Sequence, residues 1–176
     1  MRKAFVFDFD DTLAKTKCMI KVYEKNITYD TLVSKITPQE FNSYKLKKRQ
    51  YFNFDEFGDC SLIKNAKPTF LIDLAKEVHL EGHSLYILTA RENDVADAIG
   101  VWLSEYDIKA KTVFCVGGDE QSIARNKRVV LLSIMESYDR VYYYDDCEKN
   151  ISLAPSGKKI KKYKVQTWQW RLVLYN

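Results

Sequence analysis

Apolar runs and amphipathic stretches alternate along most of this chain. The runs have the length of buried strands in a parallel sheet and lie within 3–8, 83–88, 112–116 and 140–144. A last strand is expected at 161–166, where lysines are interspersed. Apolar residues recur at helical spacing at 67–81, 93–106 and 127–137, and a shorter helix is expected at 150–154. Asn93 and Asn150 are expected to cap their helices. The alternation predicts an α/β fold, a Rossmann-like parallel sheet flanked by helices with right-handed crossovers.

The segment 14–65 departs from this alternation. It contains short β-like pieces at 19–23 and 27–29, and Pro38 opens a helix with Thr37 as its N-cap. Its aromatic stretch at 51–57 fits neither the strand nor the helix period. About 50 residues is too long for a simple connection between two elements. We therefore expect an α/β core formed by 1–13 and 66–176, with 14–65 inserted after the first strand as a small cap-like subdomain.

Carboxylates follow the first strand directly, in the sequence DFDDTL at 8–13. Side chains alternate along a strand, so Asp8 and Asp10 can point the same way. Parallel sheets bind their ligands just beyond the carboxyl ends of the strands. Carboxylates this close repel one another unless a cation neutralises them, and such a density of oxygen ligands indicates Mg²⁺.

Three further polar signals fall at later element ends. Thr89 ends the second strand, where its hydroxyl can bind a phosphoryl oxygen, and Ala90 and Arg91 follow it. Arg91 could grip a phosphate with two hydrogen bonds or be a surface arginine. Lys127 is expected to open the helix after the third strand, although the flanking Arg125 and Arg128, or a solvated charge run, are alternatives. Apolar residues 141–144 precede Asp145 and Asp146, a pair that is costly to bury without a cation.

Taken in order, these four signals resemble the signatures of the haloacid-dehalogenase-like phosphohydrolases. The resemblance covers nearly all of the chain outside 14–65. It implies that Asp8 is a nucleophile that forms an aspartyl-phosphate, and that Asp10 is the general acid and base. It also implies substrate contacts from Thr89, Ala90 and Arg91, and a neutralising role for Lys127. Magnesium would be held by Asp8, the carbonyl of Asp10, Asp145 and Asp146.

The chain is similar, more loosely, to the phosphatase half of bacteriophage polynucleotide kinase-phosphatases. This likeness is carried by KAFVFD at 3–8, TARE at 89–92, the Asp145-Asp146 pair and the late Trp168-Gln169. It implies removal of 3′-phosphates from nucleic acid ends. The kinase half has no counterpart here, because the phosphate-loop motif GxxxxGK[ST] is missing. The segment 14–65 departs from the compact plan of those enzymes.

Charge is distributed unevenly over the 176 residues. From Ser156 onward there are six cations and no acid, which leaves 22 cations against 24 acids before that point. Cations and aromatic residues interleave in this tail, as in proteins that bind single strands, but lysines also guard exposed edge strands. Trp168, Trp170 and residues 172–174 could instead pack the C-terminus onto the sheet or form a dimer contact. The run KLKKR at 45–49 is a second basic cluster.

Other classes of protein are disfavoured. No apolar run approaches the roughly 18 residues of a membrane span, and the four scattered cysteines without a CxxC motif suit reduced thiols in the cytoplasm. Three functions remain: a Mg²⁺-dependent phosphatase for single-stranded nucleic acid ends, a phosphatase for nucleotides or other small phosphometabolites, and a catalytically silent binding protein. The clustered carboxylates favour a phosphatase. The oligomeric state is left open by the sequence.

Overall fold

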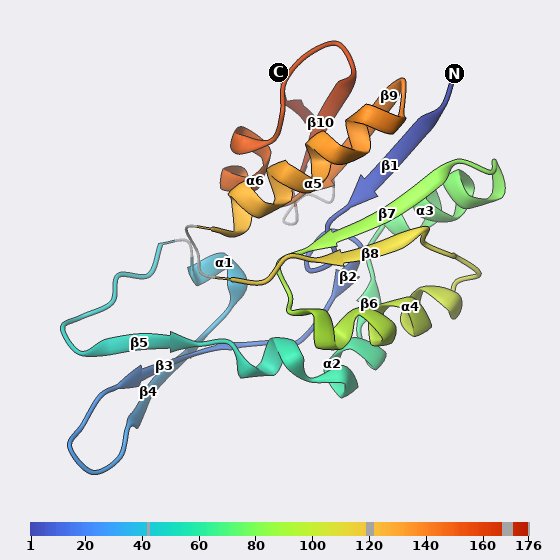
Figure 1. The fold of residues 1–176 in the computed structure, drawn as a ribbon. Helices are drawn as coiled ribbons and strands as arrows, with labels where there is room; N and C mark the ends of the chain where they lie inside the picture. Colours follow the sequence, from blue (N-terminus) through green and yellow to red (C-terminus); the bar gives the residue numbers. More distant parts are fainter. Residues whose placement is uncertain (42, 119–121, 167–170, 176) are drawn as a thin grey trace.

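A six-stranded sheet runs through the centre of the computed structural model, which describes residues 1–41, 43–118, 122–166 and 171–175 (Figure 1). Neighbouring strands are parallel, except for the antiparallel pair β10 and β11. The strand order is β11 (Arg171–Tyr175), β10 (Ile160–Gln166), β9 (Arg140–Asp145), β1 (Lys3–Phe7), β7 (Ser84–Thr89) and β8 (Thr112–Cys115). The predicted α/β class with a mostly parallel sheet is confirmed.

Helices cover both faces of this sheet. On one face, Phe5 and Phe7 of β1 join a core that includes α3 (Leu71–Leu80) and α4 (Ala96–Ser104). On the other face, Ala4 and Val6 join a core that includes α5 (Ile123–Ser137) and α6 (Glu148–Leu153). This division follows from the alternation of side chains along a strand. Of the helices described, none is long and apolar enough to cross a membrane.

The segment 14–65 contains a separate three-stranded sheet, which projects from the main body (Figure 1). Its antiparallel strands lie in the order β4 (Thr31–Ile36), β3 (Ile20–Glu24) and β5 (Gln50–Asn53), over a small core of Ile20, Val22 and Ile36. The segment also holds α1 (Pro38–Phe41), η1 (Asp55–Gly58) and α2 (Cys60–Lys64). Ile63 of α2 is buried in the main core.

The segment leaves and re-enters the main body at a single place. There, β2 (Ala14–Lys15) pairs with β6 (Lys67–Pro68) in antiparallel register. The prediction that Lys67 and Pro68 open a helix is therefore wrong. The α3 helix begins at Leu71, whose backbone N–H donates to the hydroxyl of Thr69 over 3.2 Å.

Four other local predictions are also wrong. Residues 27–29 form a bend between β3 and β4 rather than a strand. Asn93 begins the short 3₁₀ turn η2 (Asn93–Val95), and α4 starts only at Ala96. The α5 helix begins at Ile123, so Lys127 lies in its second turn. Asn150 lies inside α6, and its side chain turns back to Asp145 instead of capping the helix.

The basic C-terminal segment is built into the sheet. Residues 172–174 belong to β11, whereas Trp168, Gln169 and Trp170 lie outside the described residues. Since β11 covers β10, the alternative of a lysine-guarded edge strand is wrong for β10. Lys162 is buried beside the ring of Tyr175, and Lys164 pairs with Glu148. The tail lysines that remain exposed are Lys158, Lys159 and Lys161.

Candidate active site

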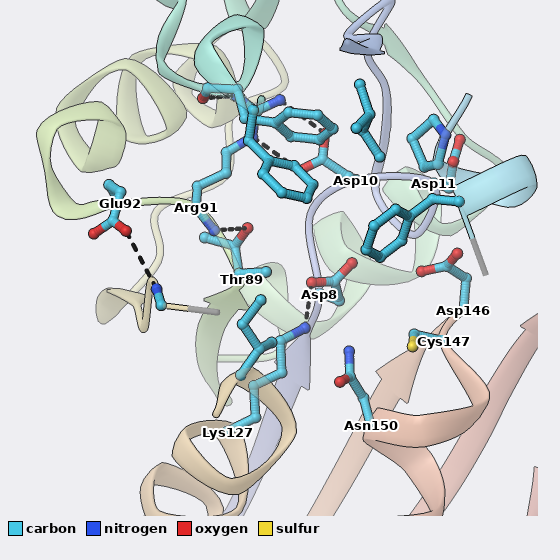
Figure 2. Close-up of a pocket in the computed structure, with 18 of the residues that line it drawn as sticks. Asp8, Asp10, Asp11, Thr89, Arg91, Glu92, Lys127, Asp146, Cys147 and Asn150 are labelled. Atoms are coloured by element: carbon cyan, nitrogen blue, oxygen red, sulfur yellow. Dashed lines mark hydrogen bonds and ion pairs between the residues drawn. The ribbon is translucent and has the colours of Figure 1, made fainter. Parts of the chain in front are cut away.

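The carboxyl ends of three neighbouring strands bring the predicted polar residues together. In the sheet order β9-β1-β7, Phe7 of β1 is level with Tyr144 and Ile87. Asp8, Thr89 and Asp145 therefore reach the same edge of the sheet, as their positions in the sequence predicted. All three are buried, with exposed fractions of 5%, 1% and 0%. Figure 2 shows Asp8 and Thr89 facing one cavity with Asp10, Lys127 and Asp146.

Lys127 reaches this edge from α5. Its Nζ donates to Asp8 Oδ1 over 2.6 Å and to Asp145 Oδ2 over 2.7 Å, and the side chain is 1% exposed. Burial lowers the pKa of Lys127, but the charges of Asp145 and Asp8 outweigh it and raise the pKa above the usual range. Arg125 and Arg128 are exposed on the same helix. Of these three candidate cations, Lys127 is the one that contacts the carboxylates.

The two aspartates that follow β9 have different surroundings. Asp145 accepts from Lys127, from the Tyr143 hydroxyl at 2.5 Å, from the Cys147 backbone N–H at 2.8 Å and from Asn150 Nδ2 at 3.1 Å. Asp146 lines the cavity instead, and no hydrogen bond joins it to a described residue. Asp145 is thus held in place by donors, whereas the Asp146 carboxylate faces the cavity.

Oxygen atoms of Asp8, Asp145 and Asp146 lie within 4.8 Å of one another, and we call these residues the carboxylate cluster. Burial raises the pKa of Asp8 to about 7, with Lys127 opposing the rise and Asp145 adding to it. Burial, with Asp145 next, also raises the pKa of Asp146 well above its usual range. The positive charge of one lysine therefore does not balance the negative charge of three carboxylates. Their charge and hard oxygen atoms suit a divalent cation such as Mg²⁺.

Arg91 is buried, so the alternative that it is a surface arginine is wrong. It is 2% exposed, and its Nε and Nη2 each donate to the Asp10 carboxylate over 2.8 Å. Its Nη1 donates to the carbonyl of Phe57, and Nη2 also contacts Cys18 Sγ at 3.2 Å. Thr16 donates a further hydrogen bond to Asp10 over 2.7 Å. Arg91 thus joins Asp10 to the segment 14–65 while still lining the cavity.

The cavity has a volume of about 710 Å³. Ala90 is among the residues that line it. Among the described residues that line it, seven are Asp or Glu and three are Lys or Arg. This excess of negative charge opposes the approach of a phosphate unless a cation neutralises it.

A scan against protein-family models finds no match for the chain, and a search of curated proteins finds none either. Family membership therefore stays a proposal. It is supported by the four motifs and by the contacts that join them.

Several residues of the site carried no distinctive signal in the sequence. Asp11 lines the cavity with a left-handed backbone, φ 55°, and accepts from Gln39 Nε2 over 2.7 Å. Burial, with the neighbouring Asp10, raises the pKa of Asp11 to about 6. Asn150 and Tyr143 hold Asp145. The position of Asn150 five residues after Asp145 could have indicated this, because a helix that follows the strand turns back over its end.

We expect the Arg91→Met variant to lose about 1–3 kcal/mol of unfolding free energy, because it leaves a largely buried carboxylate without its charged partner. The urea midpoint would measure this loss, and faster proteolysis within 14–65 would show that the segment has loosened. The control is Lys76→Met, which removes an exposed ion pair of 3.3 Å with Asp107 and should cost at most about 1 kcal/mol. Equal midpoints for both variants would show that Arg91 does not hold the segment.

Proposed function

We propose that the protein is a Mg²⁺-dependent phosphomonoester hydrolase of the haloacid-dehalogenase-like type, with 14–65 as its cap. The observation that carries this proposal is the buried Lys127, which joins Asp8 to Asp145 beside the cavity-facing Asp146. A buried lysine between two carboxylates fixes the position of Asp8 and keeps positive charge where a phosphoryl group would lie. An ordinary acidic turn would have no need of this arrangement.

The cavity residues can divide the chemistry between them. A carboxylate oxygen of Asp8 attacks phosphorus as the bond to the ester oxygen breaks, which gives an aspartyl-phosphate. Asp10 gives a proton to the leaving oxygen and then takes one from the water that releases phosphate. Thr89 and Lys127 bind the phosphoryl oxygens.

The donor set fits magnesium. Asp8 and Asp146, with Asp145 behind them and the Asp10 carbonyl, would hold it. A bound Mg²⁺ supplies positive charge beside the phosphoryl oxygens. We therefore expect phosphate release to vanish in a chelator and to return with Mg²⁺. Mg²⁺ should also raise the melting temperature without substrate, since binding at about 100 times Kd adds about 2.7 kcal/mol. A melting temperature that does not respond to Mg²⁺ would contradict the site.

Nucleic acid ends are the substrate that we favour, with nucleotides or small phosphometabolites as the alternative. The supporting observation is exposed positive charge outside the acidic cavity. Lys45, Lys47, Lys48 and Arg49 are all exposed on the segment 14–65, and Lys158, Lys159 and Lys161 are exposed on the main body. Such charge can bind the backbone of a strand whose end enters the cavity.

The test compares phosphate release from a 3′-phosphorylated oligonucleotide, a mononucleotide and p-nitrophenyl phosphate, with Asp8→Asn protein to exclude contaminants. Faster turnover of the oligonucleotide that falls steeply with salt would support nucleic acid ends. Preference for the small esters would support the alternative. If none of the esters is turned over in a way that depends on Asp8, the result would favour a silent binding protein.

A further inference from the structure

Part of the cavity lining is aromatic. It consists of Phe41 from α1, Phe54, and Phe57 from η1, and we call these three residues the aromatic roof. Ile20, Pro38 and Ile123 extend the apolar lining. The catalytic chemistry proposed above makes no use of these side chains. A phosphoryl group alone also needs far less room than about 710 Å³, a volume typical of sites for larger ligands.

The aromatic roof is held by its own contacts. The rings of Phe41 and Phe54 meet edge to face with centroids 5.5 Å apart, and those of Phe54 and Phe57 are 6.1 Å apart. The Arg91 guanidinium lies 5.2 Å from the centre of the Phe57 ring. Gln39 of α1 donates to Asp11, so both sides of the roof are tied to the loop that carries the proposed nucleophile. These contacts therefore hold the aromatic roof in place relative to Asp10 and Asp11.

Phe54 is the unusual member of this group. Its side chain is 45% exposed although it lines a cavity, whereas Phe41 and Phe57 are half-buried. An exposed aromatic side chain inside a concave site leaves ring surface open to a ligand, and ligand sites are commonly lined by aromatic side chains. A flat ring face of this kind stacks on a base in proteins that bind single-stranded nucleic acids.

The charges of the cavity limit the number of phosphates. Asp55 and Asp94 line it near the aromatic roof, in addition to the carboxylates at its floor. One phosphoryl group can be compensated by Lys127 and a cation at the floor. A second phosphate beside the first would meet the remaining carboxylates with no described cation except Arg91, which is already paired with Asp10, and Lys149.

We propose that the aromatic roof is a base-binding subsite and that the substrate is the monophosphate ester of a nucleoside, with Phe54 as the residue that determines this specificity. The proposal rests on the proposed hydrolase function, because it places the phosphoryl group at Asp8. The nucleoside is either free or the last one of a strand, and both present the same base and phosphate to the cavity.

The experiment compares kcat/KM for adenosine 3′-monophosphate with that for glycerol 2-phosphate, which is also the ester of a secondary alcohol but has no base. We expect the wild type to prefer the nucleotide. Phe54→Ala should lower the ratio at least about fivefold, because stacking on an aromatic side chain is lost. Phe54→Trp should keep the preference. The matched control is Tyr29→Ala, an exposed aromatic of the same segment that does not line the cavity.

A ratio near one in the wild type, or an unchanged ratio in Phe54→Ala, would overturn the base-binding subsite. Turnover that depends on Asp8 would in that case still support the hydrolase. If neither ester is turned over, calorimetric binding to the Asp8→Asn protein decides. Tighter binding of the nucleotide than of inorganic phosphate, lost in the Phe54→Ala background, would support the subsite without the hydrolase, and equal binding would overturn it. A 3′-phosphorylated tetranucleotide in the same assay distinguishes a strand end from a free nucleotide.

Discussion

Asp8→Asn is expected to slow phosphate release at least about 10⁴-fold, the scale of loss when a catalytic nucleophile is removed. The amide oxygen of asparagine is a far weaker nucleophile than a carboxylate, and the change leaves the shape of the side chain intact. Asp8 is 5% exposed and lies 2.6 Å from Lys127 Nζ, so no other group can take its place without rearrangement. Turnover of p-nitrophenyl phosphate with Mg²⁺ measures the effect.

The control for this variant is Asp73→Asn, an exposed aspartate on α3 that is remote from the cavity and should leave turnover unchanged. Acid-quenched wild-type protein should also carry a phosphate on the peptide that contains Asp8, and mass spectrometry can detect it. Loss of activity without any trace of this adduct would leave Asp8 as a binding residue. Full activity in Asp8→Asn would refute the proposed chemistry.

Lys127→Met is expected to give the largest loss of stability, about 3–5 kcal/mol, because it leaves Asp8 and Asp145 buried without their common cation. Chains of this length lose roughly 2–4 °C in melting temperature per kcal/mol, so we expect a decrease of about 10 °C. Calorimetry and urea denaturation in Mg²⁺-free solution would measure it.

Two further variants make this expectation specific. Arg125→Met removes an exposed cation from the same helix and should change stability by less than about 0.5 kcal/mol. The double variant Lys127→Met/Asp8→Asn should be less destabilised than Lys127→Met alone, since it also removes one of the stranded charges. A double variant that loses the sum of the two single losses would show that Lys127 acts through its packing and not through these carboxylates.

The sequence was most informative where chemistry coincides with the end of a strand. The apolar runs 4–7 and 141–144 predict strands of one parallel sheet, whose carboxyl ends lie at the same edge. That Asp8 and Asp145 meet there was implied by the resemblance to haloacid-dehalogenase-like enzymes, because the pattern alone does not give the order of the strands. Helix starts were less predictable. Ile123 opens α5 four residues before Lys127. Pro68 lies in a short strand, and the hydroxyl of Thr69, rather than Lys67, supports the first turn of α3.

Contacts between distant parts of the chain could not be predicted from local pattern. Arg91 is separated from Asp10 by 81 residues and from Phe57 by 34, and neither distance leaves a periodic signal. The aromatic stretch at 51–57 fitted neither the strand nor the helix period because its side chains pack in two different environments. Phe52 and Phe57 pack on the small core of the segment, and Phe54 and Phe57 line the cavity.

The pairing of β2 with β6 has a consequence for how such a protein can change. Ala14 lies opposite Pro68 and Lys15 opposite Lys67, so the chain enters and leaves the segment through one narrow neck, although Ile63 of the segment also packs in the main core. Insertions, deletions or an exchanged loop beyond that neck need not shift any strand of the central sheet. Under our proposals, the residues that break the ester bond and those that determine which ester binds lie on opposite sides of this neck. A lineage could therefore acquire a new substrate by recombination at two positions of the chain that lie side by side in the fold, and keep its reaction.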